Sequence, residues 1–410
     1  MHIFRHSPRP VAFSKTSPFC SGRAGDGKCA VLLSWLAIAV LACPCRAAAE
    51  SPAPVIAPKL QPLVDHRALA GAVTLVADKE HILSLETVGF ADIASQKPMP
   101  ADALFWIASM SKPITAAAFM LLVDEGRVSV DDPAEKYLPE FKNQMVIAER
   151  DEEHVLLRKP AHPILIRNIL SHTSGLSFAS PIEQPSLDLF PLGMRVKSYA
   201  MMPLNFEPDS KYEYSNAGIN TAGRIIEVIS GMGYEEFLRK RLFDPLGMQD
   251  TTSFPNDAQI TRIAKAYKAT QDQSDLEETT IGQLKYPLND PVRQPMPAGG
   301  FFSTAGDVCI FCQMLLNGGV HHGKRILTEA SVKQMTSRQT SLTLPGYGFG
   351  FSVNGATFGH GGAYSTDMSM NTDTGLITIF MVQNAGWSEE GKQSQPIFMK
   401  AAQESFGRKP

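Results

Sequence analysis

The segments with strand character lie at the two ends of this chain, and helical segments fill the part between them. Near the start, residues 71–90 hold two β-rich runs around a polar turn, which is typical of a hairpin. Near the end, strand-forming residues return and a helix follows them, over 347–353, 365–371, 376–384 and 395–406. This order predicts an antiparallel sheet made from both ends of the chain.

The middle of the chain has the hydrophobic spacing of helices, separated by Gly, Pro and Ser clusters. Helices are expected over 112–125, 166–171, 217–230 and 234–242. Asn216 is a candidate N-cap for the third of them. The fold class is therefore α+β: a sheet flanked by helices, with an inserted, mostly helical region at about 130–290. Strands and helices do not alternate as they do in βαβ units.

The first 49 residues have the pattern of a secretory signal peptide. A long basic segment precedes an apolar run over 29–43, and three alanines follow it. The run is shorter than the roughly 20 residues of a membrane span. We therefore expect a signal peptide over 1–49, a Pro-rich linker over 50–62 and one folded domain over 63–410. The mature protein would be exported, periplasmic or secreted, without a stable membrane span.

Two alternatives for this leader remain open, an uncleaved anchor and lipoprotein processing at Cys43. The residues before Cys43 form a poor lipobox. Four of the six cysteines lie in the leader, so only Cys309 and Cys312 remain in the body of the chain. Their C-x-x-C spacing is typical of redox or metal sites, but the surrounding sequence reads as a buried helix, which favours core packing.

Composition limits the kind of partner. The chain is 44% hydrophobic and 19% charged, which is typical of a globular protein, and its formal net charge is -3. That charge offers no basic excess for phosphate contacts, so nucleic acid is not an expected partner. No H-E-x-x-H or similar ligand cluster occurs, so neither a metal nor another cofactor is expected.

Ser109 and Lys112 are the first candidate catalytic pair. They stand three residues apart at the expected start of a helix, which places both side chains on one face. A serine hydroxyl needs an adjacent base to act as a nucleophile, and a lysine can be that base if its pKa is lowered. A helix N-terminus and a dry pocket both lower it.

Two further motifs follow in order, Tyr214-Ser215-Asn216 and His360-Gly361-Gly362. With these three motifs, residues 60–406 resemble the serine β-lactamase-related hydrolases. That group includes class C β-lactamases, D-alanyl-D-alanine carboxypeptidases, D-aminopeptidases and family VIII carboxylesterases. The resemblance extends to three more stretches, 166–176, 243–248 and 298–307.

The resemblance implies a role for each motif residue. Ser109 would be the acylated nucleophile, Lys112 its activating partner and Tyr214 the second member of the base system. Ionisation of the Tyr214 phenol beside a Lys112 ammonium would be favoured electrostatically, and the pair would titrate as a unit. Asn216 would hold Lys112 and the acyl side chain of the substrate. Without the resemblance, Tyr214 could be a core tyrosine and Asn216 only a helix cap.

The third motif would build the oxyanion site. The backbone N–H groups of Ser109 and Ala363 would bind the oxyanion, and Gly361 and Gly362 would let the substrate backbone come close. Where β-lactamases carry a lysine, this chain carries His360, which is mostly neutral at pH 7. A substrate carboxylate would therefore lose charge-assisted anchoring.

Small esters are thus the expected substrates, with amides and lactams as alternatives. A less favoured hypothesis is a non-catalytic penicillin-binding-type module.

Arg293 or Arg262 could restore a cation near the site. His172 is interpreted as a loop residue that hydrogen-bonds backbone. Two or three of six aromatic residues are expected to line the substrate pocket: Phe105, Trp106, Phe178, Phe301, Phe302 and Trp387.

Overall fold

The computed structural model of the chain describes residues 53–407. The predictions for the leader, including the signal peptide over 1–49 and lipoprotein processing at Cys43, lie outside the described residues. The first helix, α1 (Ala57–Asp65), begins inside the stretch expected to be a linker. Leu60 and Val64 of this helix are buried, because they pack in one cluster with the C-terminal helix. The predicted linker is therefore wrong over residues 57–62.

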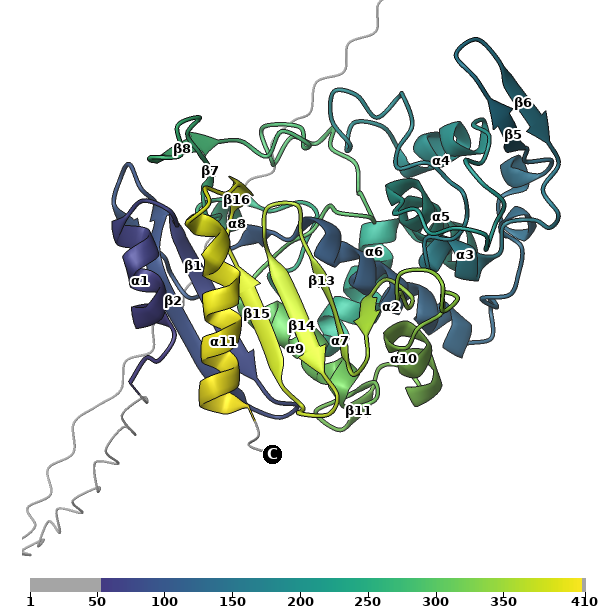
Figure 1. Ribbon diagram of the computed structural model, residues 1–410. Helices are drawn as coiled ribbons and strands as arrows, with labels where there is room; N and C mark the ends of the chain where they lie inside the picture. The colour runs from purple at the N-terminus through teal and green to yellow at the C-terminus, as the bar shows by residue number, and fades with distance from the viewer. Residues whose placement is uncertain (1–52, 408–410) are drawn as a thin grey trace, which may run out of the picture. The chain divides into compact units, whose positions relative to one another are not determined.

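Seven strands from the two ends of the chain form the central sheet, in the order β12-β13-β14-β15-β1-β2-β3 (Figure 1). The N-terminal hairpin pairs with the C-terminal strands through β1 and β15, with Val73 opposite Met381. All pairs in the sheet are antiparallel. This confirms the predicted α+β class. The strands are β1 (Gly71–Ala77), β2 (Ile82–Asp92), β3 (Lys97–Pro98), β12 (Ser352–Asn354), β13 (Thr357–Gly361), β14 (Asp367–Asn371) and β15 (Ile377–Met381).

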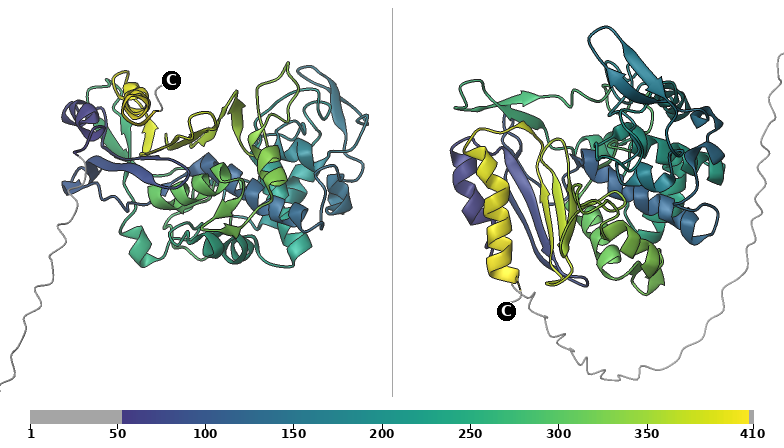
Figure 2. Two further views of the ribbon diagram at one scale, coloured as in Figure 1. Left: turned by 90° about the horizontal axis from the view of Figure 1, so that it is seen from below. Right: turned by 45° about the vertical axis from the view of Figure 1, so that its right-hand side comes forward.

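Helices cover both faces of this sheet (Figure 2). On one face, α1 and α11 (Ser394–Phe406) pack against Ala72 and Val76 of β1. The opposite face of the same strand packs in the main core with α9 (Ala305–Leu316) and α2 (Ser111–Asp124). Every residue of β1 is buried, as expected of a strand between two helical layers.

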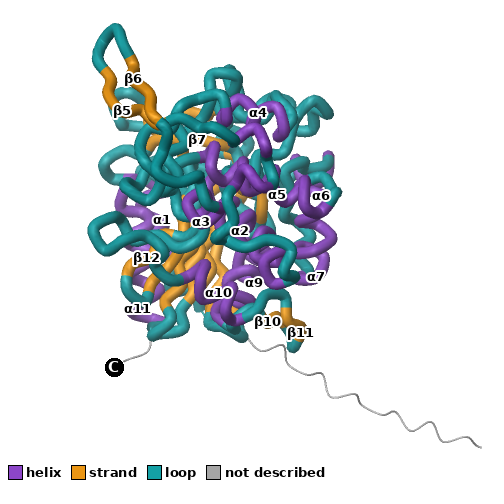
Figure 3. Tube along the Cα trace, turned by 90° about the vertical axis from the view of Figure 1, so that its right-hand side faces the viewer, coloured by secondary structure: helices purple, strands orange, loops and turns teal. Residues whose placement is uncertain are grey.

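A helical region lies beside the sheet (Figure 3). Its helices are α3 (Ile166–Leu170), α4 (Leu192–Ala200), α5 (Asn216–Ser230), α6 (Tyr234–Leu238), α7 (Asp244–Leu246) and α10 (Glu329–Thr336). The short helix α8 (Asp257–Ile260) lies apart from them, near β16 (Figure 1). Smaller sheets accompany the central one: β4 (Phe105–Trp106) with β9 (Phe302–Ser303), β5 (Val146–Arg150) with β6 (Val155–Arg158), β7 (Ala266–Ala269) with β8 (Leu276–Thr279) and β16 (Asn384–Gly386), and β10 (Val320–His321) with β11 (Lys324–Arg325).

The strand expected over 347–353 is mostly wrong, because only its last two residues belong to β12. Glycines alternate with aromatic residues here. The glycines allow neighbouring backbone to pack closely against this segment, and the segment before β12 does not form the hydrogen-bond ladder of a strand. A Cβ on Gly348 would lie 2.0 Å from the Met335 carbonyl oxygen, and Gly350 has φ +81°. The segment bends, and the ring of Tyr347 is buried.

The two cysteines of the body lie in α9 and are buried, as predicted for core residues. Burial raises the pKa of the Cys309 thiol to about 12, so it is protonated and unreactive at neutral pH. Cys312 Sγ lies 3.8 Å from Met368 Sδ on the sheet. Among residues 53–407, no helix is both long and apolar enough to span a membrane.

Candidate active site

Ser109 lies in a tight turn that leads directly into α2. Residues Ala108–Met110 form a single 3-10 turn, and α2 begins at Ser111. Ala108 has φ +44°, a left-handed conformation that costs energy for a residue with a Cβ. The turn is held from the neighbouring segment, since Ile107 N–H donates to the Phe301 carbonyl at 2.9 Å. The strained turn therefore fixes the backbone that presents the Ser109 hydroxyl.

Lys112, on the first turn of α2, is completely buried and has three polar partners. Its Nζ lies 3.1 Å from Ser109 Oγ, 2.7 Å from Asn216 Oδ1 and 2.7 Å from the Ala298 carbonyl oxygen. Burial without a carboxylate partner holds the pKa of Lys112 well below its ordinary value. A neutral amine has two N–H groups, enough for the two carbonyl oxygens, and keeps one lone pair that can accept the Ser109 proton.

The partners of Lys112 are held by the N-terminal part of α5. Asn216 is the first residue of this helix, and the N-cap is Ser215, whose Oγ accepts from Gly218 N–H at 3.0 Å. The prediction that Asn216 caps the helix is therefore wrong, and its side chain is left for Lys112. Asn220, one turn further on, accepts from Ala298 N–H at 3.1 Å and so holds the carbonyl that Lys112 contacts.

Tyr214 closes the other side of the lysine. The Lys112 Nζ lies 4.5 Å from the centre of the Tyr214 ring, over its face. Burial raises the pKa of Tyr214 despite a hydrogen bond with the Ser109 hydroxyl. The expectation that this phenol ionises beside a lysine ammonium is therefore wrong: burial pushes both groups toward their uncharged forms.

His360, on β13, reaches the same site from the sheet. Its Nδ1 lies 2.7 Å from the Gly361 carbonyl oxygen, and its Nε2 lies 3.1 Å from the Tyr347 hydroxyl and 3.5 Å from the Tyr214 hydroxyl. Burial and the nearby Lys112 lower the pKa of His360 to about 3. The histidine is thus neutral, as expected from its type.

The glycines after His360 bring the strand against the Ser109 turn, residues 107–110, which is the candidate nucleophile turn. A Cβ on Gly362 would lie 2.1 Å from Thr366 Oγ1 and 2.6 Å from the Ile107 carbonyl oxygen, so only glycine fits. A Cβ on Gly361 would meet nothing closer than 3.6 Å. Ala363 follows this contact, and its N–H has no acceptor among the described residues. An unpaired N–H beside the nucleophile turn is what an oxyanion site requires.

Neither arginine considered as a second cation is available to a substrate. Arg293 is buried and its Nε lies 2.7 Å from Asp188 Oδ2, which is buried as well. Arg262 Nη1 lies 2.8 Å from Asp250 Oδ1, and its Nε lies 3.0 Å from Asp102 Oδ2. Both guanidinium groups are therefore neutralised by carboxylates.

Of the six aromatic residues expected near the site, only Phe178 is shown in contact with a predicted site residue. Its ring centre lies 6.4 Å from that of Tyr214, and the side chain is half exposed. How many of the six line the substrate pocket stays a prediction, and Trp106 packs beside Ala108 and Tyr364. Phe105, Trp106, Phe301 and Phe302 are core residues, and Trp387 packs on the α11 side of the sheet.

The structure also brings in Tyr347 and Ala298, which the sequence did not single out, and it links Tyr347 to His172. Tyr347 contacts His360, and His172 contacts Tyr347 at 3.2 Å. His172 accepts from Ser215 N–H at 3.2 Å, which confirms that it bonds backbone. The one sequence signal for a special role of Tyr347 was its position between two glycines, Gly346 and Gly348. Ala298 contacts Lys112 through its backbone carbonyl, which every residue type has, so the sequence carries no signal for this role.

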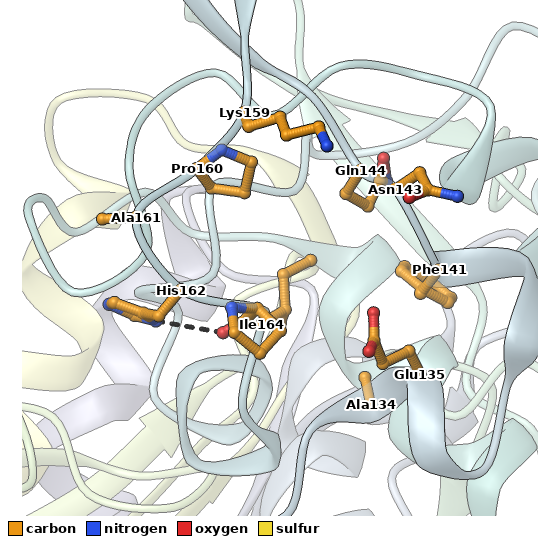
Figure 4. Close-up of a pocket in the computed structure, with 11 residues that line it drawn as sticks. Ala134, Glu135, Phe141, Asn143, Gln144, Lys159, Pro160, Ala161, His162 and Ile164 are labelled. Carbon is orange, nitrogen blue, oxygen red and sulfur yellow. Dashed lines mark hydrogen bonds between the residues drawn. The ribbon is translucent and has the colours of Figure 1, made fainter.

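One cavity lies away from these residues. It has a volume of about 230 Å³ beneath the β5–β6 hairpin and is lined by Phe141, Lys159, His162 and Ile164, among others (Figure 4). It shares no residue with the Ser109 site. No group of three or more His, Cys, Asp or Glu side chains able to hold a metal ion occurs among residues 53–407.

Comparison with known proteins shows the family and the fold of this chain. A family model described as Beta-lactamase matches residues 56–398. An uncharacterized protein of Mycobacterium tuberculosis is 31% identical over 363 residues, which are 79% of this chain and 88% of that protein. Esterase EstB of Burkholderia gladioli is 26% identical over 357 residues, or 78% and 87% of the two chains. The solved structure of EstCE1, titled a hydrolase with promiscuous acyltransferase activity, has a TM-score of 0.70 at 23% identity and covers 85% of this chain and 97% of its own.

Proposed function

The chain belongs to the beta-lactamase family and is a serine hydrolase, and we propose that it cleaves small carboxylic esters through an acyl-enzyme on Ser109. One observation carries the choice of substrate. Burial drives Lys112, Tyr214 and His360 toward their uncharged forms. Moving a substrate carboxylate out of water into this site costs free energy, and the site has no cation to compensate for that cost. A neutral ester loses far less hydration free energy when it enters the same site.

In the first step Ser109 Oγ attacks the ester carbonyl carbon while its proton passes to Lys112 Nζ. Lys112 can act as the base because its Nζ lies 3.1 Å from Ser109 Oγ and a neutral amine has a lone pair that accepts the proton. The negative charge that develops on the carbonyl oxygen is bound by the N–H groups of Ser109 and Ala363. The buried amine needs no reorganisation to accept the proton, because Asn216 and Ala298 already hold its two N–H groups.

In the second step the tetrahedral intermediate collapses and the bond to the alcohol oxygen breaks. Tyr214, a neutral phenol, donates its proton to the leaving oxygen, and the Lys112 ammonium returns a proton to Tyr214. Water then attacks the acyl-enzyme with the same groups acting in reverse. The products are the acid and the alcohol, and the enzyme regains its starting protonation.

The alternatives are a β-lactamase, a D-Ala-D-Ala carboxypeptidase or a D-aminopeptidase. β-Lactams and peptide C-termini carry a carboxylate, for which Arg293 and Arg262 supply no free charge. D-Amino-acid amides lack that carboxylate, so they are the nearest competitors. A non-catalytic penicillin-binding-type module is a weaker candidate, because the Ser109, Lys112 and Tyr214 set is assembled.

A parallel panel of short-chain esters, D-amino-acid amides and β-lactams tests the proposal, with wild type and Ser109→Ala. We expect the highest kcat/KM for the esters, lost in Ser109→Ala. Faster turnover of nitrocefin or of a D-alanyl peptide would select the alternatives. Stoichiometric acylation without turnover of any substrate would select the non-catalytic module.

We also propose that residues 1–49 direct export and are removed. The basic segment and the apolar run over 29–43 support this. N-terminal sequencing of the protein from the periplasm or medium would give a start near residue 50. Recovery only in the cytoplasm with Met1 intact would contradict it, and a lipidated Cys43 would show the lipoprotein route.

A further inference from the structure

Two histidines and a tyrosine form a continuous buried row behind the catalytic groups. His172 Nε2 lies 3.2 Å from the Tyr347 hydroxyl, which lies 3.1 Å from His360 Nε2. All three side chains are buried, and burial lowers the pKa of both histidines. The two rings are therefore neutral, and each carries one proton on one of its two nitrogens.

The two ends of this row fix every proton in it. At one end Ser215 N–H can only donate, so His172 Nδ1 is an acceptor and its proton is on Nε2. At the other end the Gly361 carbonyl can only accept, so His360 Nδ1 carries the proton and its Nε2 is an acceptor. The hydroxyl of Tyr347 then accepts from His172 and donates to His360, and no other assignment satisfies all four contacts.

This assignment determines what Tyr214 can do. A neutral imidazole nitrogen has one lone pair, and two hydroxyls lie within reach of His360 Nε2: Tyr347 at 3.1 Å and Tyr214 at 3.5 Å. The shorter contact takes the lone pair. The hydroxyl of Tyr214 is therefore not needed as the donor to His360, and the Ser109 hydroxyl is its other hydrogen-bond partner.

We propose that Tyr347 is a positioning residue that occupies His360 Nε2 and thereby keeps the Tyr214 proton available for the leaving alcohol. Its own hydroxyl is oriented by His172. The inference rests on the proposed function for its kinetic consequence only. The direction of the hydrogen bonds holds whatever the substrate is.

The kinetic test compares Tyr347→Phe with wild type on two esters of one short-chain acid, an ethyl ester and a p-nitrophenyl ester. Without the Tyr347 hydroxyl, Tyr214 becomes the donor to His360. Ethoxide needs a proton to leave and nitrophenolate does not. We expect kcat/KM to fall about tenfold or more for the ethyl ester and by less than about threefold for the p-nitrophenyl ester.

Tyr212→Phe is the matched control. Tyr212 packs in the same aromatic cluster, 5.6 Å from the Tyr347 ring centre and 5.9 Å from that of His172, but its hydroxyl makes none of these hydrogen bonds. We expect its two ester rates to change in equal proportion. Equal losses for the two esters in Tyr347→Phe would overturn the positioning role, because a merely structural defect affects both.

A second measurement needs no variant to fold. Nitrogen NMR of the wild-type protein labelled with 15N-histidine reports which ring nitrogen carries the proton. We expect Nε2–H for His172 and Nδ1–H for His360, and the opposite tautomer of either would overturn the proposal. If the tautomers are as expected but wild type cleaves neither ester, the proposed function fails while the hydrogen-bond assignment stands.

Discussion

The Lys112 amine and the Asn216 side-chain oxygen meet at 2.7 Å inside the protein, although the residues stand 104 positions apart in the chain. This contact joins α2 to α5 and completes the set of acceptors around the amine. The contact also indicates that Asn216 serves as a partner of the lysine and not as a helix cap. Substitutions at the neighbouring positions 215 and 216 can test this.

Asn216→Ala should lower kcat/KM by about tenfold to a hundredfold, because a buried hydrogen bond to the amine is lost. Ser215→Ala is its control, since it removes the actual N-cap and should cost about 1 kcal/mol of stability. We expect the Ser215 variant to melt earlier with kcat/KM within about threefold of wild type. The opposite pattern in ester assays and thermal melts would contradict the assignment.

Lys112→Met should lower kcat/KM by about 10³-fold, the effect expected from loss of a general base. It should also change how stability depends on pH. The pKa of Lys112 is lowered in the folded protein, so the unfolded chain binds more protons and wild-type stability rises with pH between the two pKa values.

The Met variant lacks this rise. Its stability relative to wild type should therefore be highest at acid pH and should decline as pH approaches the ordinary lysine pKa of about 10.4. Urea unfolding of both proteins across pH measures the difference. A difference that does not vary with pH would mean that Lys112 is charged in the folded protein.

Gly362→Ala should lower kcat/KM by about 10²-fold, because its Cβ would push the strand away from the nucleophile turn and misplace the Ala363 N–H. Gly361→Ala has room for its Cβ and should lose less than about tenfold. Ester kinetics and melting curves of the pair check this. Equal losses in the two variants would show that contact with Ile107 does not set the oxyanion site.

The pH profile of kcat/KM should rise from acid through the lowered pKa of Lys112, since the neutral amine is the base. It should not fall until pH exceeds about 10, because burial raises the pKa of Tyr214 above that ordinary tyrosine value. His360 has a pKa of about 3, so its titration does not change kcat/KM near neutral pH. A neutral ester measured against a Ser109→Ala blank tests this, and a descending limb near neutral pH would contradict a protonated Tyr214.

Much of the architecture could be predicted from local pattern. Strand-forming runs at both ends predicted the sheet, and one helical turn was enough to place Lys112 beside Ser109. The position of Tyr214 and Asn216 came from resemblance, because nothing local brings α5 to α2. Their approach depends on packing over more than 100 positions.

Three features could not be predicted, each for a physical reason. Tyr347 lies in a segment whose aromatic residues alternate as in a strand, but whose glycines allow bends. The contact of Ala298 with Lys112 uses the backbone carbonyl, which every residue type has, so the sequence cannot indicate it. The uncharged state of Tyr214 follows from its burial, so the expected tyrosinate could be rejected only once the site was assembled.

The central claim is an acyl-enzyme on Ser109, and intact mass after exposure to a phosphonate ester probe tests it most directly. We predict one adduct per chain, mapped by peptide sequencing to Ser109, with parallel loss of ester turnover and no adduct in Ser109→Ala. An unmodified wild-type mass, or an adduct and ester turnover that persist in Ser109→Ala, would contradict the account.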